Sequence, residues 1–359
     1  IEHTTVYTPG GVLEDGAVLV ADGRIQTVAP TGQMELPKNV RCLDGTGLHL
    51  VPGFIDLQIN GAMGHDFTND PQSIWAVASY LPRYGVTSFL PTIITAPLVT
   101  SAAAMTVLQQ PPAEFTGATP LGLHIEGPFL NPAKKGAHNP NYLQLPTETA
   151  VANWSPETGV RLVTLAPELT GALAVTRILT EQNVVVSVGH STATFAQATA
   201  GFDAGIRYGT HLFNAMPPLH HREPGPAGAL LADARPTVGL IVDGEHVHSE
   251  LVKLVWDLVG NGRLNLVTDA MAALGMPPGR YQLGDYDVTV NERTARRPSG
   301  TLAGSILAMD TAVRNLITFT GCTLAEALPT VTSVPANLLN LPRKGRIAPT
   351  CDADLVLLT

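Results

Sequence analysis

Hydrophobic and polar positions divide the chain into two parts with different patterns. In the first fifty residues short apolar runs alternate with turns, and the runs at 16–20 and 24–28 flank the dipeptide Asp22-Gly23. An Asp-Gly pair between alternating segments is a strong signal for a β-hairpin. From residue 51 onward, short apolar runs alternate with helix-like segments, a pattern typical of βα units and a parallel sheet.

Eight apolar runs in this second part have the length of a strand and are separated by helix-like segments. Eight parallel strands, each followed by a helix, make up a closed (β/α)8 barrel of about 250 residues. The pattern therefore predicts an α/β fold of the TIM-barrel type. The expected strands are 51–60, 86–95, 121–126, 161–166, 183–190, 208–213, 237–242 and 263–269.

The two ends of the chain predict a second, smaller unit. The C-terminal segment is β-like, as the N-terminal segment is, and together they suggest a small β-sandwich-like domain. We therefore expect residues 1–50 plus 342–359 in this domain and residues 51–341 in a catalytic barrel. A polar, turn-rich stretch near 280–301 predicts a β insertion within the barrel.

Composition narrows the classes of function. Apolar residues make up 45% of the 359 residues and charged residues only 14%, which suits a large core and argues against disorder. The formal net charge of −9 argues against nucleic acid or an anionic membrane as a partner. The three cysteines are far apart, and no uncharged apolar run approaches the roughly 20 residues of a spanning helix. We therefore expect a cytoplasmic protein in a reducing compartment.

Titratable residues fall at the ends of four expected strands. Glu126 ends the third strand and His190 the fifth, while His211 lies at the end of the sixth and Asp269 ends the eighth. The active site of a (β/α)8 barrel lies at the carboxyl ends of its strands, so these side chains should converge. One histidine at a strand end is commonly a hydrogen-bonded core group. Four converging titratable groups are harder to explain in this way, because buried unpaired charges are costly.

A bound metal accounts for this convergence. Two imidazoles and one carboxylate form a common ligand set for catalytic zinc and leave one position open for water. We predict one divalent metal per subunit, held by Glu126, His190 and His211, with Zn²⁺ expected first and Fe²⁺ or another divalent ion as alternatives. Asp269 would then be the base that takes a proton from the attacking water and returns it to the departing nitrogen. Its alternative role is to orient a metal-bound histidine.

Two further positions limit the number of metals. Gln58 and Asn60 lie two residues apart on the first expected strand, so both face the barrel interior. Carboxamides are poor zinc ligands beside imidazole, and we therefore expect no second ion there. His124 shares a face with Glu126, and we expect it to pack or hydrogen-bond one layer deeper, with metal ligation as the alternative.

Short motifs follow one another along the second part of the chain. They are PGFID (52–56), HIEGPFLN (124–131), KGAHNP (135–140), GHS (189–191), HLFNAM (211–216), REPG (222–225), DGEHV (243–247), VTDA (267–270) and LAGS (302–305). Each motif is weak alone, but the ordered series resembles the N-acetylglucosamine-6-phosphate deacetylase family of the amidohydrolase superfamily. The Asn-Ala-Met and Arg-Glu-Pro-Gly stretches are the most specific to it.

This resemblance implies hydrolysis of the N-acetyl group of a phosphosugar, N-acetylglucosamine 6-phosphate, to glucosamine 6-phosphate and acetate. It also implies a homodimer, because in the family the arginine at position 222 can come from the adjacent subunit. The implied substrate contacts are His138 and the Ala137 backbone at the acyl group, Asn214, the Ala215 backbone and Arg222 at the phosphate, His246 at the sugar, and the backbone of Leu302, Ala303 and Gly304 beside the ring. Of these, His138 would serve catalysis as the donor to the oxyanion.

Two other functions stay open at this point. Another amidohydrolase with one metal, acting on a different N-acyl sugar or a cyclic amide, would share the metal site, and the phosphate contacts at Asn214 and Arg222 would distinguish it. A catalytically dead barrel used for assembly would be expected to lose a ligand or the base, whereas this chain has all four. The Pro- and Gly-rich segment Asn131–Gln144 is expected to be a mobile lid that carries His138.

Overall fold

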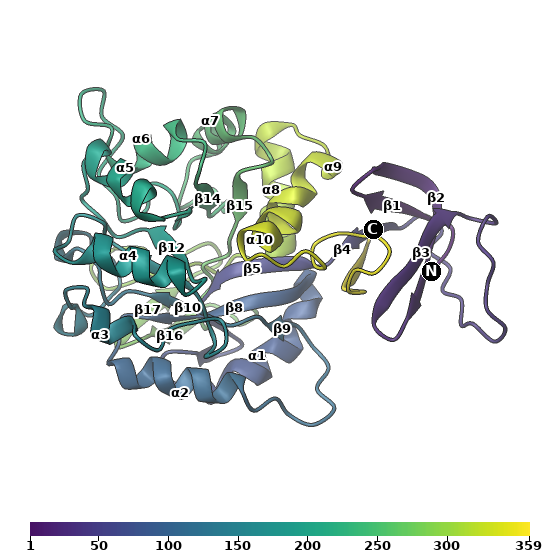
Figure 1. The fold of residues 1–359 in the computed structure, drawn as a ribbon, viewed down its shortest axis with the longest axis horizontal. Helices are drawn as coiled ribbons and strands as arrows, with labels where there is room; N and C mark the ends of the chain where they lie inside the picture. The colour runs from purple at the N-terminus through teal and green to yellow at the C-terminus, as the bar shows by residue number, and fades with distance from the viewer.

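Eight parallel strands form the centre of the larger part of the molecule (Figure 1). The computed structural model describes all 359 residues. The strands neighbour one another in chain order, and the segment after the last strand returns to the first through a bridge between Ile59 and Ala270. They are β5 (Phe54–Ile59), β8 (Val86–Ile94), β10 (Leu123–Glu126), β11 (Val160–Leu165), β12 (Val185–Val188), β13 (Tyr208–Gly209), β14 (Thr237–Leu240) and β15 (Leu264–Leu266).

The predicted α/β TIM-barrel fold is confirmed, and the observed strands lie within or overlap the eight expected segments. Several strands end earlier than expected, because the chain turns just before the polar residue. His190, His211 and Asp269 have φ values of 49°, 31° and 48°. Positive φ is uncommon for residues with a Cβ and ends an extended run. The three side chains therefore stand on turns directly above the strands.

Helices cover the outside of the barrel (Figure 1). α5 begins with a capping box between Thr194 and Gln197, and α7 turns Val252 and Val255 toward the interior. The helices are α1 (Ile74–Tyr80), α2 (Leu98–Leu108), α3 (Glu148–Val151), α4 (Ala172–Glu181), α5 (Phe195–Ala204), α6 (Gly225–Ala232), α7 (Ser249–Val259), α8 (Met309–Thr320), α9 (Leu324–Ala327) and α10 (Ser333–Leu338). No helix of the structure is both long enough and apolar enough to cross a bilayer.

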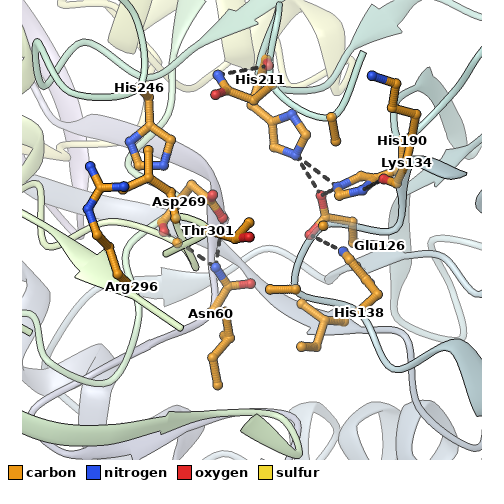
Figure 2. A pocket seen from close by; sticks show the side chains of 18 of the residues that line it. Asn60, Glu126, Lys134, His138, His190, His211, His246, Asp269, Arg296 and Thr301 are labelled. Atoms are coloured by element: carbon orange, nitrogen blue, oxygen red, sulfur yellow. Dashed lines mark hydrogen bonds and ion pairs between the residues drawn. The ribbon is translucent and has the colours of Figure 1, made fainter. Parts of the chain in front are cut away.

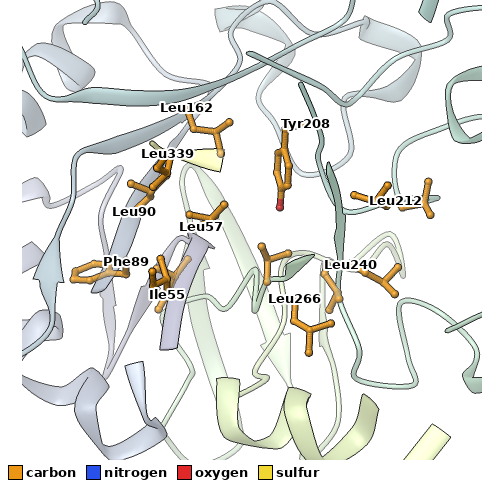
Figure 3. Packing of buried hydrophobic residues seen from close by; sticks show 14 of the residues in the cluster. Ile55, Leu57, Phe89, Leu90, Leu162, Tyr208, Leu212, Leu240, Leu266 and Leu339 are labelled. Carbon is orange, nitrogen blue, oxygen red and sulfur yellow. The ribbon is translucent and has the colours of Figure 1, made fainter. Parts of the chain in front are cut away.

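The main core lies between strands and helices and comprises 67 buried residues. Figure 3 shows part of it, with leucines from several strands packed around Tyr208. Inside the barrel, His124 lies within hydrogen-bonding distance of Thr164 (2.8 Å) and Thr92 (3.3 Å). Burial lowers the pKa of His124 to about 4, so the ring is neutral at pH 7. The expected hydrogen-bonding role of His124, one layer below Glu126, is confirmed.

The two chain ends build a separate five-stranded sheet, drawn in purple and yellow in Figure 1. Its hairpin turns at Asp22 and Gly23, whose φ values of 52° and 68° are those of a tight hairpin turn. It has its own small core around Val6, Ile25 and Leu50. The boundaries proposed for the two domains stay a prediction. In spatial order the strands are β19 (Leu355–Leu358), β4 (His49–Pro52), β1 (Thr4–Thr8), β2 (Gly11–Ala21) and β3 (Arg24–Pro30).

A three-stranded antiparallel sheet follows the eighth barrel strand, where the β insertion was expected. Its apolar residues, among them Leu283 and Val288, pack against Ile94 and Met271 in a cluster of nine buried residues. Ile94 ends β8 and Met271 lies shortly after β15, so the insertion packs beside the mouth of the barrel. Its strands are β16 (Gly279–Leu283), β17 (Tyr286–Val290) and β18 (Ala295–Arg296).

Candidate active site

A cavity of about 490 Å³ opens at the carboxyl ends of the barrel strands. Figure 2 shows its lining, in which Glu126, His190, His211 and Asp269 face the same space. Glu126 is the last residue of β10, and the other three follow their strands within three residues. The structure therefore brings together the four groups that the sequence placed at strand ends.

Glu126, His190 and His211 form a tight cluster. The Glu126 Oε1 atom lies 3.2 Å from His190 Nε2 and 3.1 Å from His211 Nε2, and the two ring nitrogens are 3.1 Å apart. All three side chains are buried. His190 Nδ1 lies 2.8 Å from the carbonyl oxygen of Lys134, which can only accept, so Nδ1 carries the proton and Nε2 of the neutral ring offers a lone pair. This donor set fits one divalent cation of the zinc type.

The negative charge of Glu126 also suits a cation. Burial alone would raise the pKa of Glu126, but the close approach of the His190 and His211 imidazoles holds it well below its ordinary value. Burial opposes the charged form of His211, yet the carboxylate of Glu126 raises the pKa of this histidine, so the ring must release a proton when Nε2 binds a metal. The carboxylate is therefore ionised at neutral pH, which is the form that a metal ligand requires.

His138 approaches this cluster from the loop that follows β10. The backbone N–H of Thr95 donates to His138 Nδ1 at 3.2 Å, and the hydroxyl of Thr95 lies 2.8 Å from the same atom. Because the N–H can only donate, Nδ1 accepts and the proton lies on Nε2, 3.7 Å from Glu126 Oε2. Burial lowers the pKa of His138 to about 3, so the ring is neutral. It presents a hydrogen-bond donor to the cavity.

Ligand atoms of Glu126, His138 and His190 lie within 4.8 Å of one another and form a second possible metal-binding set. His211 is the closer neighbour of Glu126, at 3.1 Å against 3.7 Å for His138. A ring nitrogen that carries a proton cannot ligate a metal. The hydrogen bonds therefore favour His211 as the third ligand and His138 as a donor to substrate.

Asp269 lies on the other side of the cavity and is held by two carboxamides. Its Oδ1 accepts from Asn60 Nδ2 at 2.7 Å and from Gln58 Nε2 at 3.2 Å, and the same Gln58 nitrogen donates to Glu126 at 3.1 Å. Burial, followed by the negative charge of Glu126, raises the pKa of Asp269 to about 6. A carboxyl with a pKa near neutrality can both accept and return a proton. Gln58 and Asn60 face the interior, as expected, and orient the carboxylates.

The residues implied as substrate contacts fall into two groups. Those that line the cavity are Ala137, His138, Asn214, Ala215, His246, Leu302 and Gly304, whereas Ala303 is buried and does not line it. His246 Nδ1 lies 2.6 Å from Asp243 Oδ2, which leaves Nε2 for the cavity. Arg222 is exposed and does not line the cavity of its own subunit. Its role stays a prediction.

Sequence reasoning missed Glu168. This carboxylate accepts from Ser191 Oγ at 2.7 Å, Thr192 N at 2.6 Å and Asn131 Nδ2 at 2.9 Å. It thus ties the segment after His190 to the start of the loop that carries His138. Glu168 comes three residues after β11, as Asp269 comes three residues after β15, so the same strand-end rule could have found it.

Sequence reasoning also missed two cations of the cavity lining, Lys134 and Arg296. Lys134 precedes a second lysine in a polar loop, and Arg296 lies in a polar stretch with two neighbouring arginines, Arg293 and Arg297. Neither follows an apolar strand. No pattern in the sequence separates them from solvated surface charges.

Comparison with known proteins gives a consistent result. The model of the amidohydrolase family matches residues 49–359. The chain is 40% identical over 343 residues to an N-acetylgalactosamine-6-phosphate deacetylase of Escherichia coli O157:H7, covering 94% of this chain and 88% of that protein. It is 35% identical over 367 residues to the N-acetylglucosamine-6-phosphate deacetylase of Bacillus subtilis (strain 168), covering 100% and 92%. The crystal structure of the N-acetylglucosamine-6-phosphate deacetylase of Thermotoga maritima superposes with a TM-score of 0.90 at 33% identity, covering 100% of this chain and 94% of that one.

Proposed function

We propose that this chain hydrolyses the N-acetyl group of N-acetylglucosamine 6-phosphate, because it belongs to the amidohydrolase family. Within that family it belongs to the N-acetylglucosamine-6-phosphate deacetylases. The products are glucosamine 6-phosphate and acetate. The observation that carries this proposal is the convergence of Glu126, His190, His211 and Asp269 on one cavity. A buried metal-binding cluster beside a carboxyl with a pKa near neutrality suits amide hydrolysis by water.

Glu126, His190 and His211 would hold one divalent cation, with Zn²⁺ expected first and Fe²⁺ as an alternative. When bound, the cation supplies Lewis-acid polarisation of the amide carbonyl and lowers the pKa of water. Gln58 and Asn60 support the assignment of a single ion, because both donate hydrogen bonds to carboxylates.

Asp269 accepts a proton from the attacking water and delivers it to the nitrogen as the C–N bond breaks. Asn60 and Gln58 keep its carboxylate pointed into the cavity. His138 donates from Nε2 to the carbonyl oxygen, on which negative charge develops during attack. The two groups thus divide the work, since one moves a proton and the other stabilises charge.

The rest of the cavity binds the phosphosugar. Asn214 and the backbone of Ala215 are assigned to the phosphate, His246 to the sugar, and the segment from Leu302 to Gly304 to the face of the ring. Arg222 would complete the phosphate site of the adjacent subunit, since it is exposed and lies outside the cavity of its own subunit. This assignment requires a homodimer. Cytoplasmic location stays an expectation from the sequence.

A second candidate substrate is the C4 epimer, N-acetylgalactosamine 6-phosphate. It is favoured by the 40% identity to a deacetylase of that name. Both substrates carry the same acetamido and phosphate groups, so the catalytic assignments above serve either one.

The test is acetate release from the two N-acetylhexosamine 6-phosphates, before and after treatment with a chelator. We expect turnover of at least one of them, loss of turnover with the metal, and recovery when Zn²⁺ or Fe²⁺ is added back. Unphosphorylated N-acetylglucosamine is the control. If it is hydrolysed as well as the 6-phosphates are, the phosphosugar assignment is wrong, and full activity in metal-free protein would rule out the metal-assisted reaction.

A further inference from the structure

We propose that Arg296, on β18 of the insertion, binds the phosphate group of the substrate within its own subunit. The proposal rests on the deacetylase function above and adds to it a residue that the family motifs do not contain. Its first support is position. Arg296 lines the catalytic cavity, and Figure 2 shows its guanidinium on the side of His246.

The geometry of a hexosamine 6-phosphate places its phosphate on this side. The acetamido group is on C2, and the carbon that bears C6 is C5, which lies across the pyranose ring from C2. To be hydrolysed, the acetamido group must lie beside the ligands Glu126 and His190 and within reach of the donor His138. In Figure 2 Arg296 and His246 lie across the cavity from these three residues, with Asp269 between. A phosphate on C6 therefore projects toward Arg296.

Arg296 is exposed, and its guanidinium makes one hydrogen bond and no ion pair. Its Nη1 donates to the carbonyl oxygen of Gly300 at 2.9 Å, and Gly300 also lines the cavity. No carboxylate lies within ion-pairing distance of Arg296, and its other N–H groups have no partner in the protein. A guanidinium has five N–H groups in a planar fork that matches the oxygens of phosphate.

The other arginines of the insertion have different partners or positions. Arg293 pairs with Glu245 at 2.6 Å, and the guanidinium of Arg297 lies 3.5 Å from the ring centre of Tyr286 and donates to Gly136. Arg280 is exposed and does not line the cavity. Among these four, Arg296 alone is both in the cavity and free of such a partner.

Charge balance gives an independent reason for a cation at this place. Asp269 puts a carboxyl group in the cavity, and a phosphate dianion is bound best where positive charge lies near it. Lys134, the other cation of the lining, donates to the carbonyl oxygen of Met216 at 2.9 Å and stands on the side of His190 in Figure 2. Of these two cations of the lining, Arg296 is therefore the one that lies where the C6 end of the sugar would bind.

The experiment compares Arg296→Gln and Arg296→Lys with Arg280→Gln as the matched control from the same insertion. Affinity for glucosamine 6-phosphate and for glucosamine is measured by calorimetry on the metal-loaded enzyme, and kcat/KM on the N-acetylated 6-phosphate. A charge-assisted bidentate contact predicts that Arg296→Gln weakens glucosamine 6-phosphate binding about 10- to 100-fold. Glucosamine binding should not change, Arg296→Lys should recover part of the loss, and Arg280→Gln should match wild type.

Two results would overturn the proposal. One is an unchanged affinity of Arg296→Gln for glucosamine 6-phosphate. The other is an equal loss of affinity for glucosamine 6-phosphate and for glucosamine, which would mean that Arg296 contacts the sugar ring. The proposed deacetylase function fails by a different result, namely no acetate release by the wild type. In that case the calorimetric comparison still decides whether Arg296 recognises the phosphate.

Discussion

The two walls of the cavity are built in different ways. The strand-end wall consists of Glu126, His190, His211 and Asp269, which stand on barrel strands or on the turn directly after them. Their side chains are buried, and the ligand atoms of the first three lie within 3.2 Å of one another. Such a wall is held in place by the whole barrel. It suits chemistry that needs atoms at fixed distances.

The loop wall consists of the segment 131–144 and the insertion 279–302, and it presents His138 and Arg296 to the same cavity. Two hydrogen bonds and the packing of Ala137 against the apolar cluster of the insertion join its two parts. Arg297 donates to the carbonyl oxygen of Gly136 at 3.2 Å, and Asn139 donates to Asp285 at 2.6 Å. A wall of this kind can vary without disturbing the barrel. The comparison indicates that the barrel supplies the metal ligands and the base, and that the loops supply the oxyanion donor and recognition of the substrate.

Replacing Asp269 should produce the largest effect, because this residue is the base of the strand-end wall. Asp269→Asn keeps the size and the contact with Asn60 but removes the ability to accept a proton. We expect kcat to fall by about 10²- to 10⁴-fold, with the metal content unchanged. Steady-state acetate release and metal analysis of the same preparation measure both. Activity within a few-fold of wild type would mean that Asp269 only orients its neighbours.

His138 tests whether the loop wall also takes part in the chemistry. His138→Phe removes the Nε2 donor, and we expect kcat to fall by about 10²- to 10³-fold, as for the loss of one oxyanion donor. His138→Gln, which keeps an N–H donor, should retain more activity. His211→Phe serves as the comparison for metal binding.

The metal content of these variants separates the two possible ligand sets. If His211 is the third ligand, His211→Phe loses the metal and His138→Phe keeps it. The opposite result would make Glu126, His138 and His190 the ligands and place His138 in the strand-end wall. The proposed division between the two walls would then be wrong.

The strand-end wall could be predicted from the sequence, and the reason is physical. A buried strand gives an apolar run, and a carboxylate or imidazole directly after it stands out from the run. Chain order then determines which ends meet, because every strand of the barrel points the same way. Glu168 also follows the carboxyl end of a barrel strand. It was not predicted because Ala166 and Pro167 separate it from the apolar run.

The loop wall could not be predicted in this way. The insertion lies beside the barrel mouth because Leu283 and Val288 pack against Ile94 and Met271, a tertiary contact that no local pattern encodes. Arg296 and Arg297 are adjacent in the same polar stretch, and the sequence does not show which of them faces the cavity. The family motifs located His138, since it lies within a recognisable segment, but they left Arg296 unmarked.

The smallest predicted effect concerns the layer below the strand-end wall and is one of stability. Asp56 is buried, and its Oδ2 accepts from the hydroxyl of Thr268 at 2.6 Å, next to Asp269. Burial raises the pKa of Asp56 to about 7 against the opposing hydrogen bonds of Thr268 and Gln58. The folded protein therefore binds a proton more tightly than the unfolded chain. The resulting stability is fully present below the unfolded pKa and is lost as pH rises through the folded pKa.

Asp56→Asn removes this titration while it keeps an acceptor for the backbone N–H groups of Gln58 and Thr268. We expect the wild type to lose about 3 kcal/mol of unfolding free energy from this group between pH 5 and pH 8. The variant should lose less over the same interval, while Asp257→Asn on the exposed side of α7 should follow wild type. Denaturant unfolding of the metal-loaded proteins at the two pH values measures the difference. Equal losses in Asp56→Asn and wild type would show that Asp56 does not titrate in this range, and that the strand-end wall rests on a carboxylate that stays charged.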